Sequence, residues 1–377
     1  MGERADRPWS GAVTVVGQRI LFVAAVPSTA MFIAPLADEL RLRGFRTALA
    51  VGAETADRFD EQSFDTVFRL PPFRRGSPPQ LASAGRALIA AIRSWRPALL
   101  HLHTPYAVAL GRLAACVTQT DHIAVVHGTL FDVPGRAAAA YRAEERGLAR
   151  LTPTYVAVNP EDADEYRRLA PRSRVVLAPC GGLGIDLTAL TRQANACAKP
   201  TRADGPQVLV LGRMTPDKGL DLCVEAWTRL RESVPSAQLC FVGRSFPGEP
   251  RWDPPRLEGI SHLPFTRNPG SAIASSSLLL SGSAREGFAL VVAEALLIGV
   301  PVVAVTNRGS RRIADLGVEG LSLVQPDPGL MADAMGAALG GRDAKVPPAV
   351  REAWDRKSVV GFHADLIAER VGGLGGR

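Results

Sequence analysis

The sequence predicts an α/β protein in which two series of strands and helices follow one another along the chain. Short apolar runs alternate with longer segments of helical periodicity, which is the pattern of a parallel sheet flanked by helices. A polar, turn-rich stretch at 190–207 divides these runs into an earlier and a later series. The length of 377 residues is generous for one domain and suits two. We therefore expect two domains that face each other across a cleft.

The first series is defined by apolar periodicity and by the turn residues between its runs. Its first expected helix follows a turn at 27–29 and is closed by Gly44. In Leu81–Trp95, the apolar residues Leu88 and Ile92 recur at helical spacing. We expect strands at Ile20–Val26, Arg46–Val51, Ala98–His103, His122–His127, Tyr155–Asn159 and Val175–Ala178, and helices at Phe32–Gly44, Leu81–Trp95 and Ala107–Thr118.

The second series repeats the architecture of the first without any short-period repeat, so we expect two Rossmann-like halves. Its expected strands are Val208–Leu211, Gln238–Val242, Leu278–Ser281 and Pro301–Val305, and its helices are Leu220–Arg231, a segment near Leu330–Leu339, and Val350–Val371. We place an amino-terminal tail at 1–18, the first domain at 19–189, the linker at 190–207, the second domain at 208–349, and a carboxy-terminal helix and tail at 350–377.

Charge and composition are those of a globular protein. The net charge of +7 comes from 44 Lys and Arg against 37 Asp and Glu, and the excess is spread over both halves. No basic tail or stripe is present, so we do not expect nucleic acid as a partner. A mild positive balance suits phosphate-bearing substrates or transient contact with an anionic membrane surface.

The cysteines and the apolar runs indicate a reducing compartment and no membrane span. The five cysteines contain no C-x-x-C pair, which argues against a zinc site or a disulfide framework. The first 18 residues lack a basic start that leads into a long apolar core, and no apolar run reaches the ~18 residues of a spanning helix. We expect a cytoplasmic protein, and leave peripheral contact with the inner membrane face open.

Two glutamates, Glu286 and Glu294, bracket seven mostly apolar residues. The strand Leu278–Leu280 precedes them, and a helix end, a Gly-Val-Pro stop and another strand follow them. Glu286 therefore lies in the turn after a strand, where an open α/β sheet binds its ligand, and Glu294 lies about two helical turns further on. The start of this helix offers N–H groups to a phosphate, and the carboxylates can accept hydrogen bonds from sugar hydroxyls.

A second strand–turn–helix carries a basic residue at each end of its turn. The loop Gly212–Gly219 follows the strand Val208–Leu211 and contains Arg213 and Lys218. Its spacing is not that of a Walker motif. The planar fork of Arg213 and the point charge of Lys218 can hold a diphosphate, although two solvated basic residues would look the same in sequence.

Histidines mark the ends of two strands in the first half. His127-Gly128 ends one strand, and a lone histidine at such a place is more often structural than catalytic. His101 and His103 lie two apart, so they share one face of their strand, with His103 nearer the carboxyl end and His101 in the core. No carboxylate at suitable spacing completes a metal site with them, and we expect no metal.

Together these motifs resemble those of a known enzyme family. R-E-G-F-A-L-V-V-A-E at 285–294, followed by A-L-L-I-G-V-P-V-V-A-V, resembles the E-x7-E signature of the family-4 retaining glycosyltransferases of the GT-B fold. Gly212–Gly219 is similar to the G-R-x-x-x-x-K-G loop of that family, and His127-Gly128 to its His-Gly pair. The resemblance covers about residues 20–339 and is strongest in the second half.

Finer matches and two departures are also visible. V-N-P-E-D at 158–162 with C-G-G-L-G-I-D-L at 180–187 resembles the end of the first domain in the bacterial polysaccharide-type subgroup. Ala289 stands where the family usually has glycine, and P-S-T-A at 27–30 replaces a Gly-Gly pair seen in several members.

The resemblance implies a nucleotide-sugar donor, a metal-free mechanism without any cofactor, and an acceptor hydroxyl of unknown identity. It assigns Arg213 and Lys218 to the leaving diphosphate, His127 to the donor sugar near its reacting carbon, and Glu286 to the hydroxyls of that sugar. Glu294 would bind the ribose. The remaining donor-binding residues it implies are Gly212, Gly287, Phe288, Ala289 and Leu290.

Two other functions and several details stay open. A sugar-nucleotide 2-epimerase uses a similar scaffold, and an inactive relative could serve as a partner subunit. The base, the sugar, the acceptor and the oligomeric state are not fixed by the sequence. The arginines on Leu81–Trp95 would suit a helix that lies on an anionic membrane, but we favour a helix that covers the sheet.

Overall fold

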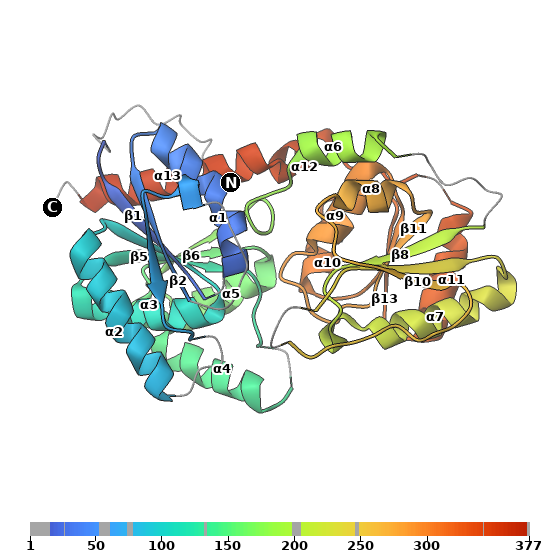
Figure 1. Ribbon diagram of the computed structural model, residues 1–377, viewed down its shortest axis with the longest axis horizontal. Helices are drawn as coiled ribbons and strands as arrows, with labels where there is room; N and C mark the ends of the chain where they lie inside the picture. Colours follow the sequence, from blue (N-terminus) through green and yellow to red (C-terminus); the bar gives the residue numbers. More distant parts are fainter. Residues whose placement is uncertain are drawn as a thin grey trace, which may run out of the picture. The chain divides into compact units, whose positions relative to one another are not determined.

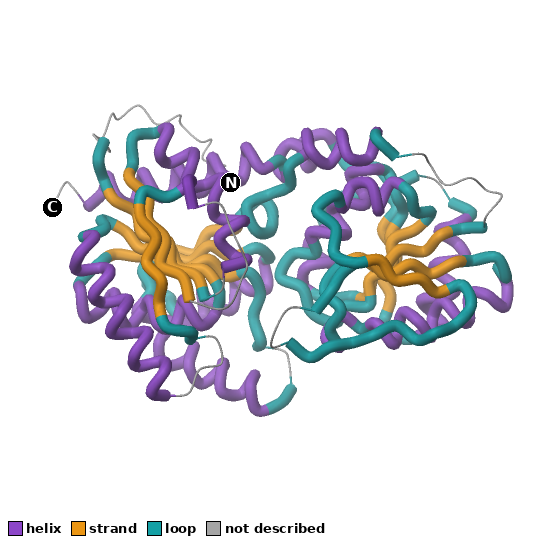
Figure 2. Tube along the Cα trace, in the orientation of Figure 1, coloured by secondary structure: helices purple, strands orange, loops and turns teal. Residues whose placement is uncertain are grey.

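The structure is a computed structural model that describes residues 16–25, 27–52, 61–73, 78–131, 134–197, 205–245, 249–341 and 343–374. It contains two sheets, each accompanied by helices, as Figures 1 and 2 show. The predicted α/β class is therefore confirmed. Three parts of the predicted tails and linker, at 1–15, 198–204 and 375–377, lie outside the described residues.

The longer sheet has seven strands in the order β3-β2-β1-β4-β5-β6-β7. Strand β1, the third in this order, pairs in parallel with β2 and β4, so that Ile20 lies opposite both Thr47 and Leu99. Residues 20–24 have no accessible surface, as expected for a strand covered on both faces. The strands are β1 (Arg19–Ala24), β2 (Arg46–Gly52), β3 (Thr66–Leu70), β4 (Leu99–His103), β5 (Asp121–Val126), β6 (Thr154–Ala157) and β7 (Arg174–Leu177). The helices of this part are α1 (Pro27–Leu42), α2 (Pro78–Trp95), α3 (Pro105–Thr118), α4 (Arg136–Leu148) and α5 (Pro160–Leu169).

The shorter sheet has six strands in the order β10-β9-β8-β11-β12-β13. Its core contains apolar residues of β8, β9, β11 and β12, and Trp227, Leu230, Met331 and Met335 from two helices pack against them. The strands are β8 (Gln207–Leu211), β9 (Gln238–Val242), β10 (Ile260–Leu263), β11 (Leu278–Ser281), β12 (Val302–Val305) and β13 (Leu321–Val324). The helices that follow along the chain are α6 (Leu187–Asn195), α7 (Leu220–Ser233), α8 (Pro269–Ala274), α9 (Leu290–Ile298), α10 (Arg308–Ala314), α11 (Pro328–Leu339), α12 (Pro348–Trp354) and α13 (Arg356–Leu374). Helix α6 packs against α8, and most of α13 lies with the longer sheet (Figure 1).

Both sheets show the strand order of doubly wound α/β folds. The chain moves outward in one direction from β1 to β3 and then returns to the other side with β4; β8, β10 and β11 repeat this arrangement. Ligands of such sheets bind beyond the carboxyl ends of the strands at the point of reversal. In the shorter sheet, that point lies between β8 and β11.

The described chain forms two compact units, residues 16–123 with 361–374, and residues 124–360. In the first unit, α13 is held by two ion pairs: Arg370 Nη2 donates to Asp121 Oδ1 at 3.0 Å, and Arg43 Nη1 to Asp365 Oδ1 at 2.5 Å. Every residue predicted to act on the donor belongs to the second unit. None of the helices in the described part is both long and apolar enough to cross a bilayer.

The expected strands agree with the structure to within about two residues, but several elements differ. Helix α1 begins at Pro27, not at Phe32, because proline is favoured in a first helical turn. Residues 190–195 of the predicted linker continue α6, which Asp186 caps by accepting from Ala189 N at 2.8 Å. The structure adds β3, β10, β13, α4, α5, α8 and α10, which the sequence does not predict, and it divides the predicted helix Val350–Val371 at Asp355 into α12 and α13.

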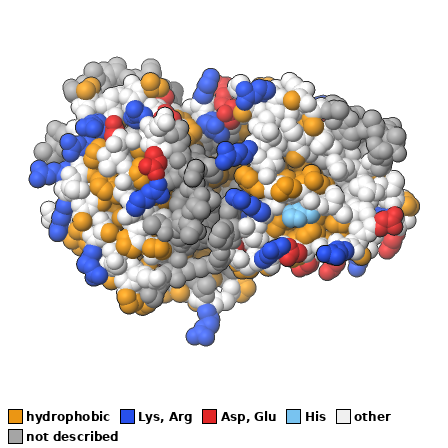
Figure 3. All heavy atoms as spheres, in the orientation of Figure 1, with side chains coloured by type: hydrophobic (Ala, Val, Ile, Leu, Met, Phe, Trp, Pro, Cys, Tyr) orange, Lys and Arg blue, Asp and Glu red, His pale blue; other side chains and the backbone are white. Residues whose placement is uncertain are grey.

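The edge strand β10 explains one of these omissions. Three of its four residues are exposed, so it carries no apolar signature of a buried strand. Leu263 and Phe265 are each about half exposed. A pale blue histidine lies among orange apolar side chains on the face seen in Figure 3. The arginine-bearing helix α2 covers the sheet as expected, since Leu88 and Ile92 are buried and Arg86 and Arg93 are exposed.

Candidate functional site

The two predicted donor loops follow β8 and β11, the strands on either side of the reversal point of the shorter sheet. Their backbones touch, because a Cβ on Gly219 would overlap the carbonyl oxygen of Gly282, and a Cβ on Gly282 would overlap that of Gly219. Gly219 also has a φ of +62°, which favours glycine. These glycines let the two loops meet at the place where an α/β sheet binds its ligand.

Lys218 and Glu286, one from each loop, form an ion pair. Lys218 Nζ donates to Glu286 Oε1 at 2.5 Å, and each side chain keeps about a fifth of its surface exposed. An ammonium group has three N–H donors, so Lys218 can hold Glu286 and still offer donors to a ligand. The structure thus brings together two residues that are 68 positions apart.

Arg213 is held by carboxylates on both sides. Its Nη1 donates to Glu249 Oε1 at 2.7 Å and its Nη2 to Asp217 Oδ2 at 3.3 Å. Glu249 is almost fully buried, whereas Arg213 is 38% exposed. The guanidinium is therefore held by a buried carboxylate and still partly accessible to solvent. Glu249 carries no motif and was not predicted, because nothing in P-G-E-P indicates its partner.

The His127-Gly128 pair lies directly against the loop that contains Glu286. A Cβ on Gly287 would overlap the carbonyl oxygen of His127, and a Cβ on Gly128 would lie 3.3 Å from Gly287. Asn159 Nδ2 donates to the carbonyl oxygen of Gly287 at 2.9 Å. The end of β5 and the turn after β11 are therefore in backbone contact, as the resemblance leads one to expect.

His127 is uncharged at neutral pH. Its surroundings are dense enough that burial lowers the pKa of the imidazole to about 4. A neutral imidazole has one nitrogen that donates and one that accepts. It can therefore hydrogen-bond a sugar hydroxyl without adding positive charge.

Glu294 has an environment that differs from that of Glu286. Burial raises the pKa of its carboxyl to about 7, and the charge of Arg356 opposes that rise. Cys180 is nearby, since Glu294 also contributes to the rise of the thiol pKa to about 12, which burial dominates. Near neutral pH, Glu294 is thus poised between its charged and neutral forms.

Of the remaining predicted donor residues, Phe288 and Ala289 are buried and Gly212 has no side chain. Phe288 is buried against Gly181, and its ring meets that of Trp354 edge-on with centroids 5.8 Å apart. Ala289 has φ −82°, which any L-residue adopts, so the departure from glycine does not strain the loop. Leu290 begins α9, and its N–H donates to the carbonyl oxygen of Phe288 at 3.0 Å. Gly212, at φ +154°, leaves open space where a side chain would lie.

His101 and His103 belong to the core. His101 and His103 share a strand face, as predicted, and their Nδ1 and Nε2 lie 2.7 Å apart. Both are buried, including His103, which we expected nearer a cleft. The described residues contain no group of three or more His, Cys, Asp or Glu that could hold a metal.

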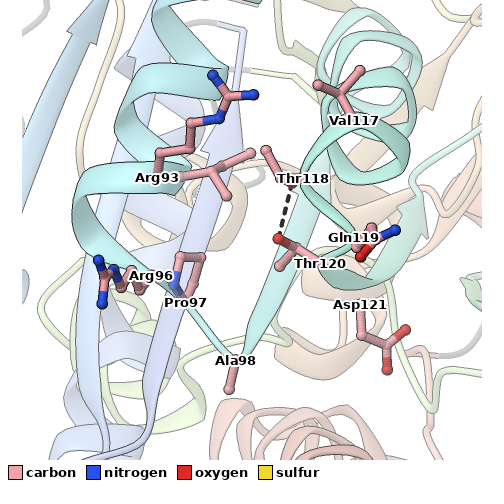
Figure 4. A pocket seen from close by; sticks show the side chains of 10 residues that line it. Arg93, Arg96, Pro97, Ala98, Val117, Thr118, Gln119, Thr120 and Asp121 are labelled. Atoms are coloured by element: carbon pink, nitrogen blue, oxygen red, sulfur yellow. Dashed lines mark hydrogen bonds between the residues drawn. The ribbon is translucent and has the colours of Figure 1, made fainter.

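A cavity of about 620 Å³ lies elsewhere, at the amino-terminal ends of β4 and β5. Figure 4 shows Arg93, Arg96 and Asp121 among its lining side chains, with Thr118 hydrogen-bonded to Thr120. None of the predicted site residues lines it. It lies at the end of the strands opposite to the one where α/β sheets bind ligands.

Comparison with known proteins identifies the family. A family model described as Glycosyltransferase Family 4 matches residues 29–182, and one described as Glycosyl transferases group 1 matches residues 205–340. The chain is 24% identical over 322 residues to a putative glycosyltransferase, EpsD, of Bacillus subtilis, which covers 80% of this chain and 82% of EpsD. It is 26% identical to the phosphatidyl-myo-inositol mannosyltransferase of Mycobacterium tuberculosis, over 64% of this chain and 63% of that protein.

Solved structures show the same fold. HepE from Anabaena, in complex with UDP and glucose, superposes with a TM-score of 0.69 at 17% identity over 93% of this chain and 99% of HepE. Sucrose-phosphate synthase from Thermosynechococcus elongatus gives a TM-score of 0.71 at 17% identity over 93% and 98%. The two family models account for most of both Rossmann-like halves, and the chain belongs to glycosyltransferase family 4, as an enzyme with the GT-B fold.

Proposed function

We propose that the enzyme transfers a sugar, with retention of configuration and without a metal, from a nucleotide-diphosphate sugar to an acceptor hydroxyl. One observation carries the proposal: Arg213 and Lys218 occupy the loop at the reversal point, and carboxylates hold both while leaving them partly exposed. Cations fixed in advance at a phosphate position stabilise the charge that grows on a leaving diphosphate.

The residues around the pair supply the rest of the proposed mechanism. Glu286 accepts hydrogen bonds from the donor-sugar hydroxyls, and the neutral imidazole of His127 contacts the sugar near its reacting carbon. The acceptor oxygen attacks on the face from which the diphosphate departs, so the bond to the acceptor forms as the bond to the diphosphate breaks. The departing phosphate takes the acceptor's proton, and no protein nucleophile is needed.

The nucleotide can be proposed from the relatives. HepE is described with UDP and with UDP-glucose, so uridine diphosphate is our first choice for this chain. For the acceptor we propose a hydroxyl of a glycan, a lipid-linked molecule or a small molecule. Among the relatives are proteins named for inositol-containing acceptors. Peripheral contact with an anionic membrane stays a prediction, which co-sedimentation with vesicles would test.

Nucleotide binding is the first test. We expect UDP to stabilise the protein more than GDP, ADP or dTDP, and by ~2.7 kcal/mol at 100 times its dissociation constant. Thermal unfolding with each nucleotide, in excess chelator, measures this. Stabilisation that appears only when magnesium or manganese is restored would contradict metal-free binding. No response to any of the four would contradict the donor site.

Stereochemistry tests the reaction class. With UDP-glucose as the probe and water as acceptor, we expect the released glucose to appear first as the α anomer of the donor. Proton NMR, recorded before the anomers equilibrate, distinguishes the two forms. First appearance of the β anomer would mean inversion. A 2-epimer of the nucleotide sugar formed without an acceptor would favour the isomerase instead.

A further inference from the structure

A buried carboxylate, Asp162, connects the segments that carry His127 and Glu286. It lies in the first turn of α5 and has no accessible surface. Thr129 Oγ1 donates to its Oδ1 at 2.7 Å, and Arg308 Nη1 donates to the same oxygen. Thr129 stands two residues after His127, and Arg308 is the first residue of α10.

Asn159 connects Asp162 to the loop that contains Glu286 and Gly287. Its Oδ1 caps α5 by accepting from Asp162 N at 2.8 Å, and one Nδ2 hydrogen goes to Asp162 Oδ2 at 2.8 Å. The other reaches the carbonyl oxygen of Gly287 at 2.9 Å. Both hydrogens of the amide group are therefore used. Asn159 itself has no accessible surface.

The start of helix α10 contacts both the Glu286 loop and Thr129. Gly309 N donates to the carbonyl oxygen of Glu286 at 3.0 Å, and Arg308 Nη1 also reaches Thr129 Oγ1 at 3.3 Å. A Cβ on Gly309 would lie 2.9 Å from Glu286 Cβ, so the helix start is fitted to this loop. All these residues belong to the compact unit 124–360.

We propose that Asp162 is a positioning residue, which sets His127 at a fixed distance from Glu286 for transfer of the sugar. Removing a carboxylate from water is unfavourable unless hydrogen bonds and an ion pair compensate, and apolar residues often stabilise such a place equally well. A fully satisfied polar network, by contrast, specifies one arrangement. The inference rests on the proposed function, since that is where His127 and Glu286 act on the donor sugar.

The same two helices provide a control. Arg311 Nε donates to Glu161 Oε1 at 3.0 Å. Glu161 directly precedes Asp162 in α5, and Arg311 follows Arg308 by three positions in α10. This pair is exposed, with both side chains at or above a third of their surface. An exposed ion pair contributes little to stability. Glu161→Gln therefore changes the same charge between the same helices without touching the buried network.

The experiment compares Asp162→Asn, Thr129→Val, Thr129→Ser and Glu161→Gln, with UDP release from UDP-glucose and the Kd of free UDP as readouts. Thr129→Val keeps the shape and removes the hydroxyl, so it tests the network even if Asp162→Asn fails to fold. We expect kcat to fall about 10-fold in Asp162→Asn and Thr129→Val, because a small misplacement near the reacting atoms slows the reaction strongly. The Kd of UDP should stay within about twofold. Thr129→Ser keeps the hydroxyl and should retain the wild-type kcat, and Glu161→Gln should match the wild type in both kcat and Kd.

The outcomes separate this inference from the proposed function. Wild-type kcat in Thr129→Val would overturn the positioning role alone. A loss of UDP affinity and unfolding temperature in proportion to kcat would also overturn it, since the network would then only stabilise the fold. A wild-type protein that binds no UDP and releases none from UDP-glucose would overturn both.

Discussion

Replacing Lys218 with alanine is expected to lower turnover by about 10²–10³-fold while leaving the fold intact. The ammonium group is our candidate for the charge that meets the leaving diphosphate, and loss of one such fixed donor has effects of this size. Lys218 and Glu286 are both partly exposed, so water can hydrate the carboxylate that loses its partner. The free energy of unfolding should change by less than about 1 kcal/mol.

UDP release from UDP-glucose gives the turnover, and titration calorimetry gives the affinity for free UDP, which should also weaken. Lys345→Ala is the matched control, because Lys345 Nζ lies 3.8 Å from Glu319 Oε2 in an exposed pair on the same chain. It removes the same charge and should behave as the wild type. Wild-type UDP affinity in Lys218→Ala would show that the diphosphate binds elsewhere.

Local patterns were sufficient for the positions of the two donor loops. Strand, turn and helix signals put Arg213, Lys218 and Glu286 at the ends of β8 and β11, and the structure has these strands within one or two residues. The order of the strands then brings the loops together. Which side chain pairs with which is a tertiary property. The Lys218–Glu286 and Arg213–Glu249 pairs join residues far apart in sequence, so no local spacing indicates them.

Some signals were present but were interpreted differently. Asn159-Pro160 followed by Glu161 and Asp162 is a helix start, with a capping side chain, a proline at the first position and an acidic first turn. The predicted strand Tyr155–Asn159 extends into this cap, and α5 is therefore absent from the predicted elements. Asp162 is buried because it lies in the first turn of that helix, so its burial is not predicted either. Strand β10 is different, because its exposed residues offer no apolar run to detect.

Glu294→Gln is expected to stabilise the protein above neutral pH and to weaken UDP binding. Burial raises the pKa of Glu294 from 4.5 to about 7, so the folded state favours the protonated carboxyl. Between pH 4.5 and about 7, the unfolded chain releases this proton while the folded protein keeps it, so the free energy of unfolding falls as the pH rises. A glutamine keeps the shape of the neutral acid and removes this dependence. The variant's gain should be below about 1 kcal/mol at pH 5 and reach at most about 3 kcal/mol at pH 8.

A charge that destabilises the fold is retained when a ligand needs it, and the proposed ligand here is the ribose, whose hydroxyls donate to a carboxylate. Urea unfolding at pH 5 and pH 8 measures the gain, and titration with UDP measures the loss. Glu286→Gln is the comparison. Because we propose that the Glu286 carboxylate binds hydroxyls of the donor sugar, this variant should slow turnover of UDP-glucose and leave the affinity for free UDP nearly unchanged. Equal effects of the two substitutions on UDP affinity would contradict this division. If Glu294→Gln is more stable at pH 8 but binds UDP as tightly as the wild type, Glu294 does not bind the ribose. The gain in stability alone requires only that Glu294 is buried.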